Sequence, residues 1–389
     1  MSAVKTIDIL HNNMEEKPIT KRDNYLVKSF EIVRKFKFMI YIQALMGLNK
    51  MHIFPEHKIL HWLIHVNSVT IVVISSYLFI VKPYDSESFN FYKQVLLCAY
   101  VALVINSAFC YNKKLKNFFR DLAKFDDMLN IGTSVDKLTP TLYATIYIVV
   151  DMTYSIIEMS LLCYYLYFEL VAVTISVYFL TFAHDVEHVF YCTLQRLILR
   201  RLRVLRAHVE KTFAKSEREN NSDPLDYLSK NIDLDITQLH LAYELLHKAL
   251  EKINRIISLP MFVILLSSGV ATILTLRRIF FYEVESWVIF GVLWCLKYAM
   301  MVTIPCGYSG GTLQQVKRIR ALLFDAIQNQ SLEKVERRKV KAFFQLAKDN
   351  EFAYALWGVI RLNMSLPLSY CSLCSTYLVI IIQFSKFID

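Results

Sequence analysis

The sequence predicts an all-α polytopic membrane protein with seven transmembrane helices, a cytoplasmic N-terminus and an extracellular C-terminus. Of its 389 residues, 55% are hydrophobic, and the mean hydropathy is +0.35. A soluble domain has about 45–50% apolar residues. The chain contains 8 Gly and 8 Pro, too few for a turn-rich β protein. Its long apolar runs lack the alternation of a transmembrane barrel, so helices remain as the way to satisfy the backbone in lipid.

Seven apolar runs approach the length that crosses a bilayer, about 20 residues in a helix. In chain order the runs are 61–81, 95–111, 142–162, 164–183, 256–275, 287–307 and 367–384. No Gly or Pro separates the third run from the fourth, so the boundary between them stays open. Residues 25–48 are also apolar but contain four basic side chains, which favours an amphipathic interfacial helix over an eighth span.

The basic residues predict the orientation of these spans, because Lys and Arg collect on the cytoplasmic side of a membrane. With the N-terminus inside, the basic clusters at 113–124, 196–206 and 317–341 all face the cytoplasm. The other side receives only a few basic residues, such as Lys82 and the pair at 277–278. This bias also accounts for the net charge of +10, so we expect no nucleic-acid partner. The polar start of the chain lacks the apolar core of a cleavable signal.

We expect a single membrane domain over 1–389, in which charged helices continue the spans into the cytoplasm. The segment 216–224 is expected to be a linker between two of these helices. The predicted parts are a cytoplasmic N-terminus with an interfacial helix (1–57), spans one to four (58–183), helical extensions and a linker (184–255), spans five and six (256–307), cytoplasmic helices (308–366) and the last span (367–389).

A histidine constellation supports one alternative, a membrane metalloenzyme. His57, His61 and His65 share a helix face, and His184 and His188 lie one turn apart, a spacing that can chelate a metal. A third cluster with matching carboxylates is missing, so we expect no metal, no other cofactor and no enzymatic activity. The other alternative is a G-protein-coupled receptor, which would need an outward N-terminus and so conflicts with the basic loops.

The last apolar run carries a polar stripe on one helix face. Its members recur every three or four residues: Ser365, Ser369, Ser372, Thr376, Val379 and Gln383. An amide such as that of Gln383 is costly in lipid unless it meets a partner or water. The stripe therefore either bonds neighbouring helices or lines an aqueous path.

The end of this run resembles the TYhhhhhQF signature of insect gustatory receptors. Thr376-Tyr377 is followed by five apolar residues and then by Gln383-Phe384. The residues Gly358, Leu362 and Asn363 resemble the start of the last helix in that family. Before these positions the resemblance covers architecture only, namely seven spans, an inward N-terminus and a similar length.

The resemblance implies a ligand-gated cation channel of four identical or related subunits in the plasma membrane of a gustatory neuron, opened by a small-molecule tastant. One last helix from each subunit would surround the pore. Gln383 and Phe384 would form the constriction, with Val379 or Ile380 as an adjoining apolar ring and Thr376 on the same wall. Many sugar-sensing relatives carry an acid where this chain has Leu378, which favours a non-sugar ligand such as a bitter plant compound.

The family's ligand pocket lies in the outer halves of the earlier spans, where this chain is rich in aromatic residues with a few acids. Aromatic walls with a few polar groups suit a small amphipathic organic ligand, although interfacial belts and ordinary packing use the same residues. Asp151 lies deeper and is expected to pair with a neighbouring helix. The candidates are Tyr92, Tyr100, Tyr154, Glu158, Tyr165, Glu169, Trp287, Trp294 and Tyr298.

Overall fold

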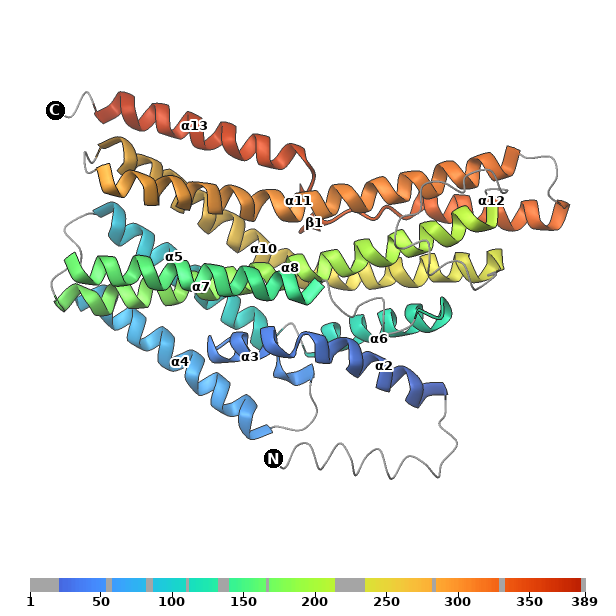
Figure 1. Cartoon of the computed structure of the whole chain (residues 1–389), viewed down its shortest axis with the longest axis horizontal. Helices are drawn as coiled ribbons and strands as arrows, with labels where there is room; N and C mark the ends of the chain where they lie inside the picture. Colours follow the sequence, from blue (N-terminus) through green and yellow to red (C-terminus); the bar gives the residue numbers. More distant parts are fainter. Residues whose placement is uncertain are drawn as a thin grey trace.

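A computed structural model describes residues 21–53, 58–81, 87–109, 112–131, 140–165, 168–213, 235–281, 285–328 and 333–385 of the chain. Nearly all of them are α-helical (Figure 1). The helices are α2 (Lys21–Lys35), α3 (Lys37–Leu45), α4 (Lys58–Val81), α5 (Glu87–Phe109), α6 (Asn112–Met128), α7 (Pro140–Tyr165), α8 (Phe168–Phe213), α10 (Ile236–Phe281), α11 (Glu285–Gln328), α12 (Lys334–Asp349) and α13 (Ser365–Ser385). A short helix η1 (Met51–Ile53) precedes α4, and an antiparallel hairpin of β1 (Ala355–Leu356) and β2 (Ile360–Arg361) precedes α13.

Five helices in the described ranges are long and apolar enough to cross a membrane. They overlap five of the predicted runs, at Ile59–Val81, Phe89–Ala108, Leu142–Leu161, Ile236–Ile279 and Val288–Gln328. The fourth predicted run, 164–183, begins at the end of α7 and lies mostly in α8, which continues without a break into charged residues. The seventh lies in α13, whose apolar part Ser365–Ile380 is shorter. Seven crossings therefore remain a prediction, and five are supported by length and apolarity.

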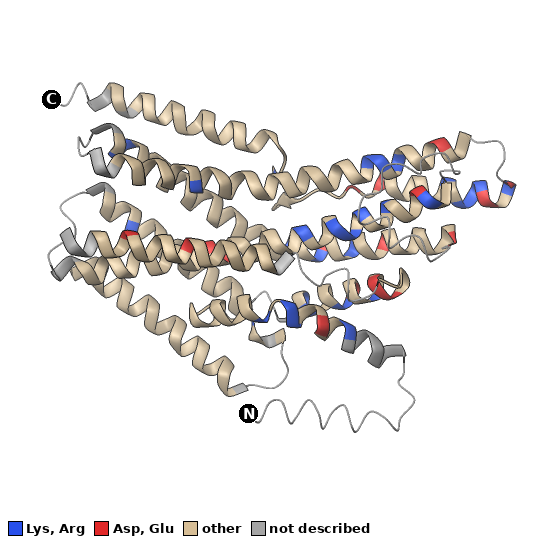
Figure 2. Cartoon of the chain, viewed as in Figure 1, with Lys and Arg blue, Asp and Glu red and all other residues tan. Residues whose placement is uncertain are grey.

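Three helices extend well beyond a bilayer. α8, α10 and α11 have 46, 46 and 44 residues, or about 65–70 Å at 1.5 Å per residue, roughly twice the hydrocarbon thickness. Charged residues gather at one end of the molecule, where these helices meet α2, α6 and α12 (Figure 2). We call this end the base: α2, α6, α12, the C-terminal halves of α8 and α11 and the N-terminal half of α10.

The base has its own buried core and its own ion pairs. The Tyr243 ring of α10 packs between Phe343 of α12 and Phe352, with centroids 5.6 and 5.0 Å away, and its hydroxyl donates to the Asn350 carbonyl at 3.1 Å. Arg201 of α8 makes a bidentate pair with Asp126 near the end of α6, at 2.8 and 2.6 Å. The charged extensions thus form a packed layer rather than solvated tails. The predicted linker at 216–224 lies outside the described residues.

The segment predicted as one interfacial helix, 25–48, forms two helices with a break at Phe36. Phe36 is itself buried and packs on Phe119 of α6 and Phe190 of α8, with ring centroids 5.6 and 6.1 Å away. The following residue, Lys37, begins α3, which exposes Phe38 and Tyr41. The break at Phe36 therefore lets α2 pack in the base while α3 presents aromatic residues outward.

Candidate functional site

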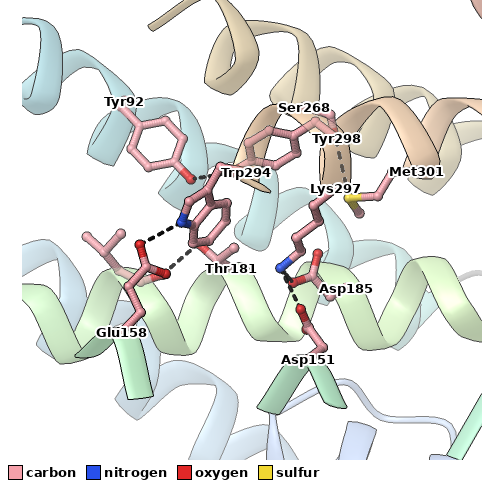
Figure 3. A network of polar contacts seen from close by, with 11 residues as sticks. Tyr92, Asp151, Glu158, Thr181, Asp185, Ser268, Trp294, Lys297, Tyr298 and Met301 are labelled. Carbon is pink, nitrogen blue, oxygen red and sulfur yellow. Dashed lines mark hydrogen bonds and ion pairs between the residues drawn. The ribbon is translucent and has the colours of Figure 1, made fainter. Parts of the chain in front are cut away.

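The end of the molecule opposite the base holds a cluster of aromatic side chains around one carboxylate. Trp294 of α11 donates its Nε1–H to Glu158 Oε1 of α7 at 2.7 Å (Figure 3). The Tyr178 side chain of α8 also lies beside Glu158, whose Oε2 has no hydrogen-bond partner among the described residues. We define the aromatic cluster as Tyr92, Tyr154, Glu158, Tyr178, Trp294 and Tyr298, which come from α5, α7, α8 and α11.

Trp294 is the centre of this cluster. The ring centroids of Tyr154, Tyr178 and Tyr298 lie 6.4, 6.2 and 5.5 Å from that of Trp294. The hydroxyls of Tyr92 and Tyr298 are 3.4 Å apart (Figure 3). Among the described residues, the buried Tyr154 hydroxyl has no hydrogen-bond partner. The cluster therefore combines apolar ring surface with a carboxylate and one unused hydroxyl.

A buried ion triad lies next to the aromatic cluster. The Lys297 ammonium of α11 is 2.7 Å from Asp151 Oδ1 of α7 and 2.5 Å from Asp185 Oδ2 of α8 (Figure 3). The three side chains are 11%, 7% and 3% exposed. The same ammonium lies 4.6 Å from the Trp294 ring centroid, a cation–π distance. The prediction that Asp151 pairs with a neighbouring helix is confirmed, and the partner is Lys297.

The cluster lies near the helix ends that point away from the base (Figure 1). Glu158 is about two turns from the end of α7 at Tyr165, and Tyr92 is within about two turns of the start of α5 at Glu87. Trp294 follows the start of α11 by two to three turns. The ion triad is deeper by a turn or two. A ligand arriving at this end would meet the aromatic cluster before the triad.

The structure brings five of the predicted ligand-binding residues together: Tyr92, Tyr154, Glu158, Trp294 and Tyr298. Tyr100 lies apart from them, because it is fully buried and its hydroxyl donates to the Met46 carbonyl at 2.7 Å. The side chains of Tyr165, Glu169 and Trp287 lie outside the described residues.

Three residues at the site were not predicted from the sequence: Tyr178, Asp185 and Lys297. The signal for Lys297 was present, since it is the only Lys or Arg in the run 287–307 and an intramembrane charge is a functional hint by itself. Asp185 follows Tyr178 by seven residues, two helical turns, so the two share a face of α8.

α13 packs on α10 and α11 along one narrow face and lies at an edge of the molecule (Figure 1). Every fourth residue is wholly or partly buried, namely Leu366, Tyr370, Cys374, Leu378 and Ile382. The Tyr370 hydroxyl donates to the Ser268 carbonyl of α10 at 3.0 Å and lies 2.7 Å from the Thr272 hydroxyl. These contacts fix the rotation of α13 about its axis.

The polar stripe lies on the opposite side of α13. All six members, from Ser365 to Gln383, are exposed in the single chain. A helix turns by about 100° per residue. At that rotation, the mean direction of the stripe is opposite to the mean direction of the five buried or partly buried residues. Val379 and Ile380 are 51% and 40% exposed. The side chain of Phe384 lies outside the described residues.

Three of the candidate histidines, His61, His65 and His188, contact amide or carbonyl groups. His61 and His65 both lie beside the Asn49 amide, at 3.2 and 3.1 Å. His188 contacts the Met301 carbonyl through Nε2 at 2.7 Å. Within the described ranges, no three His, Cys, Asp or Glu side chains are grouped closely enough to hold a metal ion. His57 lies outside those ranges.

A second buried polar network joins the segment before α4 to α8. The Lys50 ammonium pairs with Glu187, whose carboxylate also accepts from the Gln43 amide at 2.8 Å. The ammonium lies 3.9 Å from the Phe190 ring centroid. Burial lowers the pKa of Lys50 to about 8, against the opposing effect of Glu187. This network anchors the segment that leads into α4 on α8.

Comparisons with known proteins agree on the class of fold. A family model described as 7tm chemosensory receptor matches residues 36–388. A search of curated proteins finds no match. The chain is similar to the insect olfactory receptor OR5 from Machilis hrabei in complex with eugenol, with a TM-score of 0.62, 13% identity and coverage of 92% of this chain and 99% of that one. For a second structure of the same receptor the values are 0.57, 12%, 93% and 100%. At such identities the likeness concerns the fold.

Proposed function

This chain belongs to the 7tm chemosensory receptor family, and from that premise we propose that it is a subunit of a gustatory, ligand-gated cation channel. As a member of a receptor family it is not an enzyme. The gustatory assignment rests on the signature from Thr376 to Phe384. We propose the plasma membrane of a taste neuron as its location and an inward N-terminus as its orientation, on the strength of the basic base (Figure 2).

The observation that carries the channel proposal is the outward-facing polar stripe of α13. α13 buries one face on α10 and α11 and turns hydroxyls and the Gln383 amide away from its own subunit. In lipid that amide would be costly. Four copies arranged around an axis would turn these stripes toward one another, where they would line a water-filled path. The homotetramer or heterotetramer and the central cation path follow from this arrangement as parts of the proposal.

The constriction is proposed at the outer end of the stripe. Gln383 and Phe384 would form its narrowest rings, with Val379 or Ile380 as the adjoining apolar ring and Thr376 further in. An apolar ring closes a pore by excluding water, while amide oxygens replace part of an ion's hydration when the pore is open. Monovalent cations, and Ca²⁺ with them, would pass through the widened ring.

The aromatic cluster is the proposed ligand site. The olfactory receptor with the similar fold binds eugenol, a small aromatic compound, and rings around a polar group suit a ligand of that size. Tyr92, Tyr154, Glu158, Trp294 and Tyr298 are the proposed contacts, and Tyr165, Glu169 and Trp287 stay candidates for the same wall. Tyr100 is assigned to packing, because its hydroxyl is already used by Met46.

Ligand binding is proposed to reach the pore through α10 and α11. Trp294 contributes to the aromatic cluster and lies on α11, and Tyr370 of α13 is hydrogen-bonded to Ser268 and Thr272 of α10. A ligand that moves α11 and α10 therefore moves the surface on which α13 rests. The ligand opens the channel only if it binds the open arrangement more tightly, a population shift. The base would hold the subunits together during this movement.

Replacing Gln383 with alanine tests the pore assignment. We expect surface-expressed Gln383→Ala to lose several-fold ligand-evoked current and to shift the reversal potential in mixed cation solutions, because each subunit loses one polar group from the constriction. Whole-cell recording with ion substitution measures both quantities. Ser375→Ala is the control, since Ser375 is exposed on the same helix but lies off the stripe. Unchanged current and selectivity in Gln383→Ala would remove Gln383 from the pore.

A further inference from the structure

We propose that the ligand of the aromatic cluster is a protonated amine carried on an apolar or aromatic body, with its ammonium beside Glu158. This inference rests on the proposed function, because it names the ligand class of the site proposed there. It goes beyond that function by excluding neutral compounds as the preferred ligands. It is argued from the charges buried in and next to the cluster and from the rings that surround them.

The buried charges next to the cluster do not balance. Three acids, Asp151, Glu158 and Asp185, are buried, and Lys297 is the cation that pairs with two of them. With all four ionised, these side chains leave an excess of two negative charges. Lys297 is already used by both aspartates, and one oxygen of Asp151 still has no hydrogen-bond partner among the described residues. The site as a whole therefore attracts positive charge.

Glu158 makes no ion pair in the described part of the chain, although the charges of Lys297 and Arg278 act on it from further away. Its hydrogen-bond donor there is the neutral Trp294 indole, and its Oε2 has no hydrogen-bond partner among the described residues. The next cations outward are Lys93 and Arg278, which lie over the Phe89 ring at 5.7 and 5.6 Å. Burying a carboxylate without a counter-charge is unfavourable. An ammonium group from a ligand removes that penalty, and a neutral ligand does not.

The surrounding rings are arranged for the same chemistry. Trp294, Tyr154 and Tyr178 present aromatic surface around the carboxylate, and such faces attract an ammonium within about 6 Å of the ring centroid. The protein already uses this preference, since the Lys297 ammonium lies 4.6 Å from the Trp294 centroid. The unpartnered Tyr154 hydroxyl supplies one further acceptor for an ammonium N–H. An aromatic cage with a carboxylate at its edge is suited to an organic cation.

The test compares charged ligands with neutral compounds of the same shape on the purified full-length receptor. The probes are protonated aromatic amines of increasing size, each paired with an isostere that has carbon in place of nitrogen. The smallest pair is phenethylammonium and its neutral carbon isostere, propylbenzene. We expect saturable stabilisation against thermal unfolding by cations of the panel and none by their isosteres. The proposal is overturned if no cation stabilises the receptor, or if the isosteres act equally well.

Glu158→Gln separates the charge from the shape, because the amide keeps an oxygen for the Trp294 indole. We expect it to weaken cation binding by about tenfold to a hundredfold, as for loss of a charged hydrogen bond. Tyr154→Phe is the second variant, with a smaller loss. Glu244→Gln is the control, because Glu244 is an acid of the base paired with Lys248. Unchanged cation affinity in Glu158→Gln contradicts the proposal. Binding without cation current would instead count against the channel.

Discussion

Lys297→Met is expected to abolish the folded receptor at the cell surface. The substitution leaves Asp151 and Asp185 buried together without their cation. Removing one partner of a buried ion pair costs about 3–5 kcal/mol, a large part of the stability of an ordinary protein. Surface labelling of tagged receptor in intact cells and thermal unfolding of the purified protein measure the effect.

A rescue variant shows whether charge is the reason for the loss. Combining Lys297→Met with Asp151→Asn and Asp185→Asn removes all three charges, and we expect it to restore most of the surface expression. Lys248→Met is the matched control, because Lys248 makes an exposed pair with Glu244 and such pairs contribute about 0–1 kcal/mol. Wild-type expression of Lys297→Met, or failure of the triple variant to recover, would contradict a structural role for the ion triad.

Arg201→Leu is expected to have the second largest effect, this time in the base. Arg201 holds Asp126 through two hydrogen bonds, and the two side chains are 4% and 11% exposed. Leucine leaves the carboxylate buried without its partner, at a cost of about 3–5 kcal/mol. We expect less folded receptor and a lower temperature of unfolding, measured by fluorescence-detected size exclusion after heating.

The control for this substitution lies two residues further along the same helix. Arg203 is exposed, so Arg203→Leu removes one positive charge from the same cluster of the base without breaking a buried ion pair. We expect that it changes stability by about 0.5 kcal/mol or less. Equal loss in both variants would mean that the charge of the cluster, rather than the pair with Asp126, stabilises the base.

The sequence does not show which basic residues are buried in ion pairs and which are exposed. Arg201 and Arg203 contribute equally to the inward bias of basic residues, and Lys297 is a lone base in an apolar run. In the structure, Arg201 and Lys297 are buried and paired, whereas Arg203 is exposed. Basic residues that contribute equally to the predicted orientation therefore differ in their contribution to the free energy of unfolding.

The helical class of the fold, the long apolar helices and their charged helical extensions could be predicted from the sequence, because they depend on local composition. A run of apolar residues satisfies its backbone in lipid only as a helix, whatever surrounds it. The stripe of α13 could also be predicted, because residues that recur every three to four positions lie on one face of a single helix. Among the ligand-site candidates, five came together and Tyr100 did not.

The tertiary structure alone decided which charges meet. Asp151, Asp185 and Lys297 lie on α7, α8 and α11, and Glu158 meets Trp294 across 136 positions of sequence. Their meeting depends on how far each helix is rotated about its own axis. A helix that is apolar on every side carries no periodic signal for that rotation. Contacts such as those of Tyr370 with α10 set it, and such contacts exist only after the helices have packed.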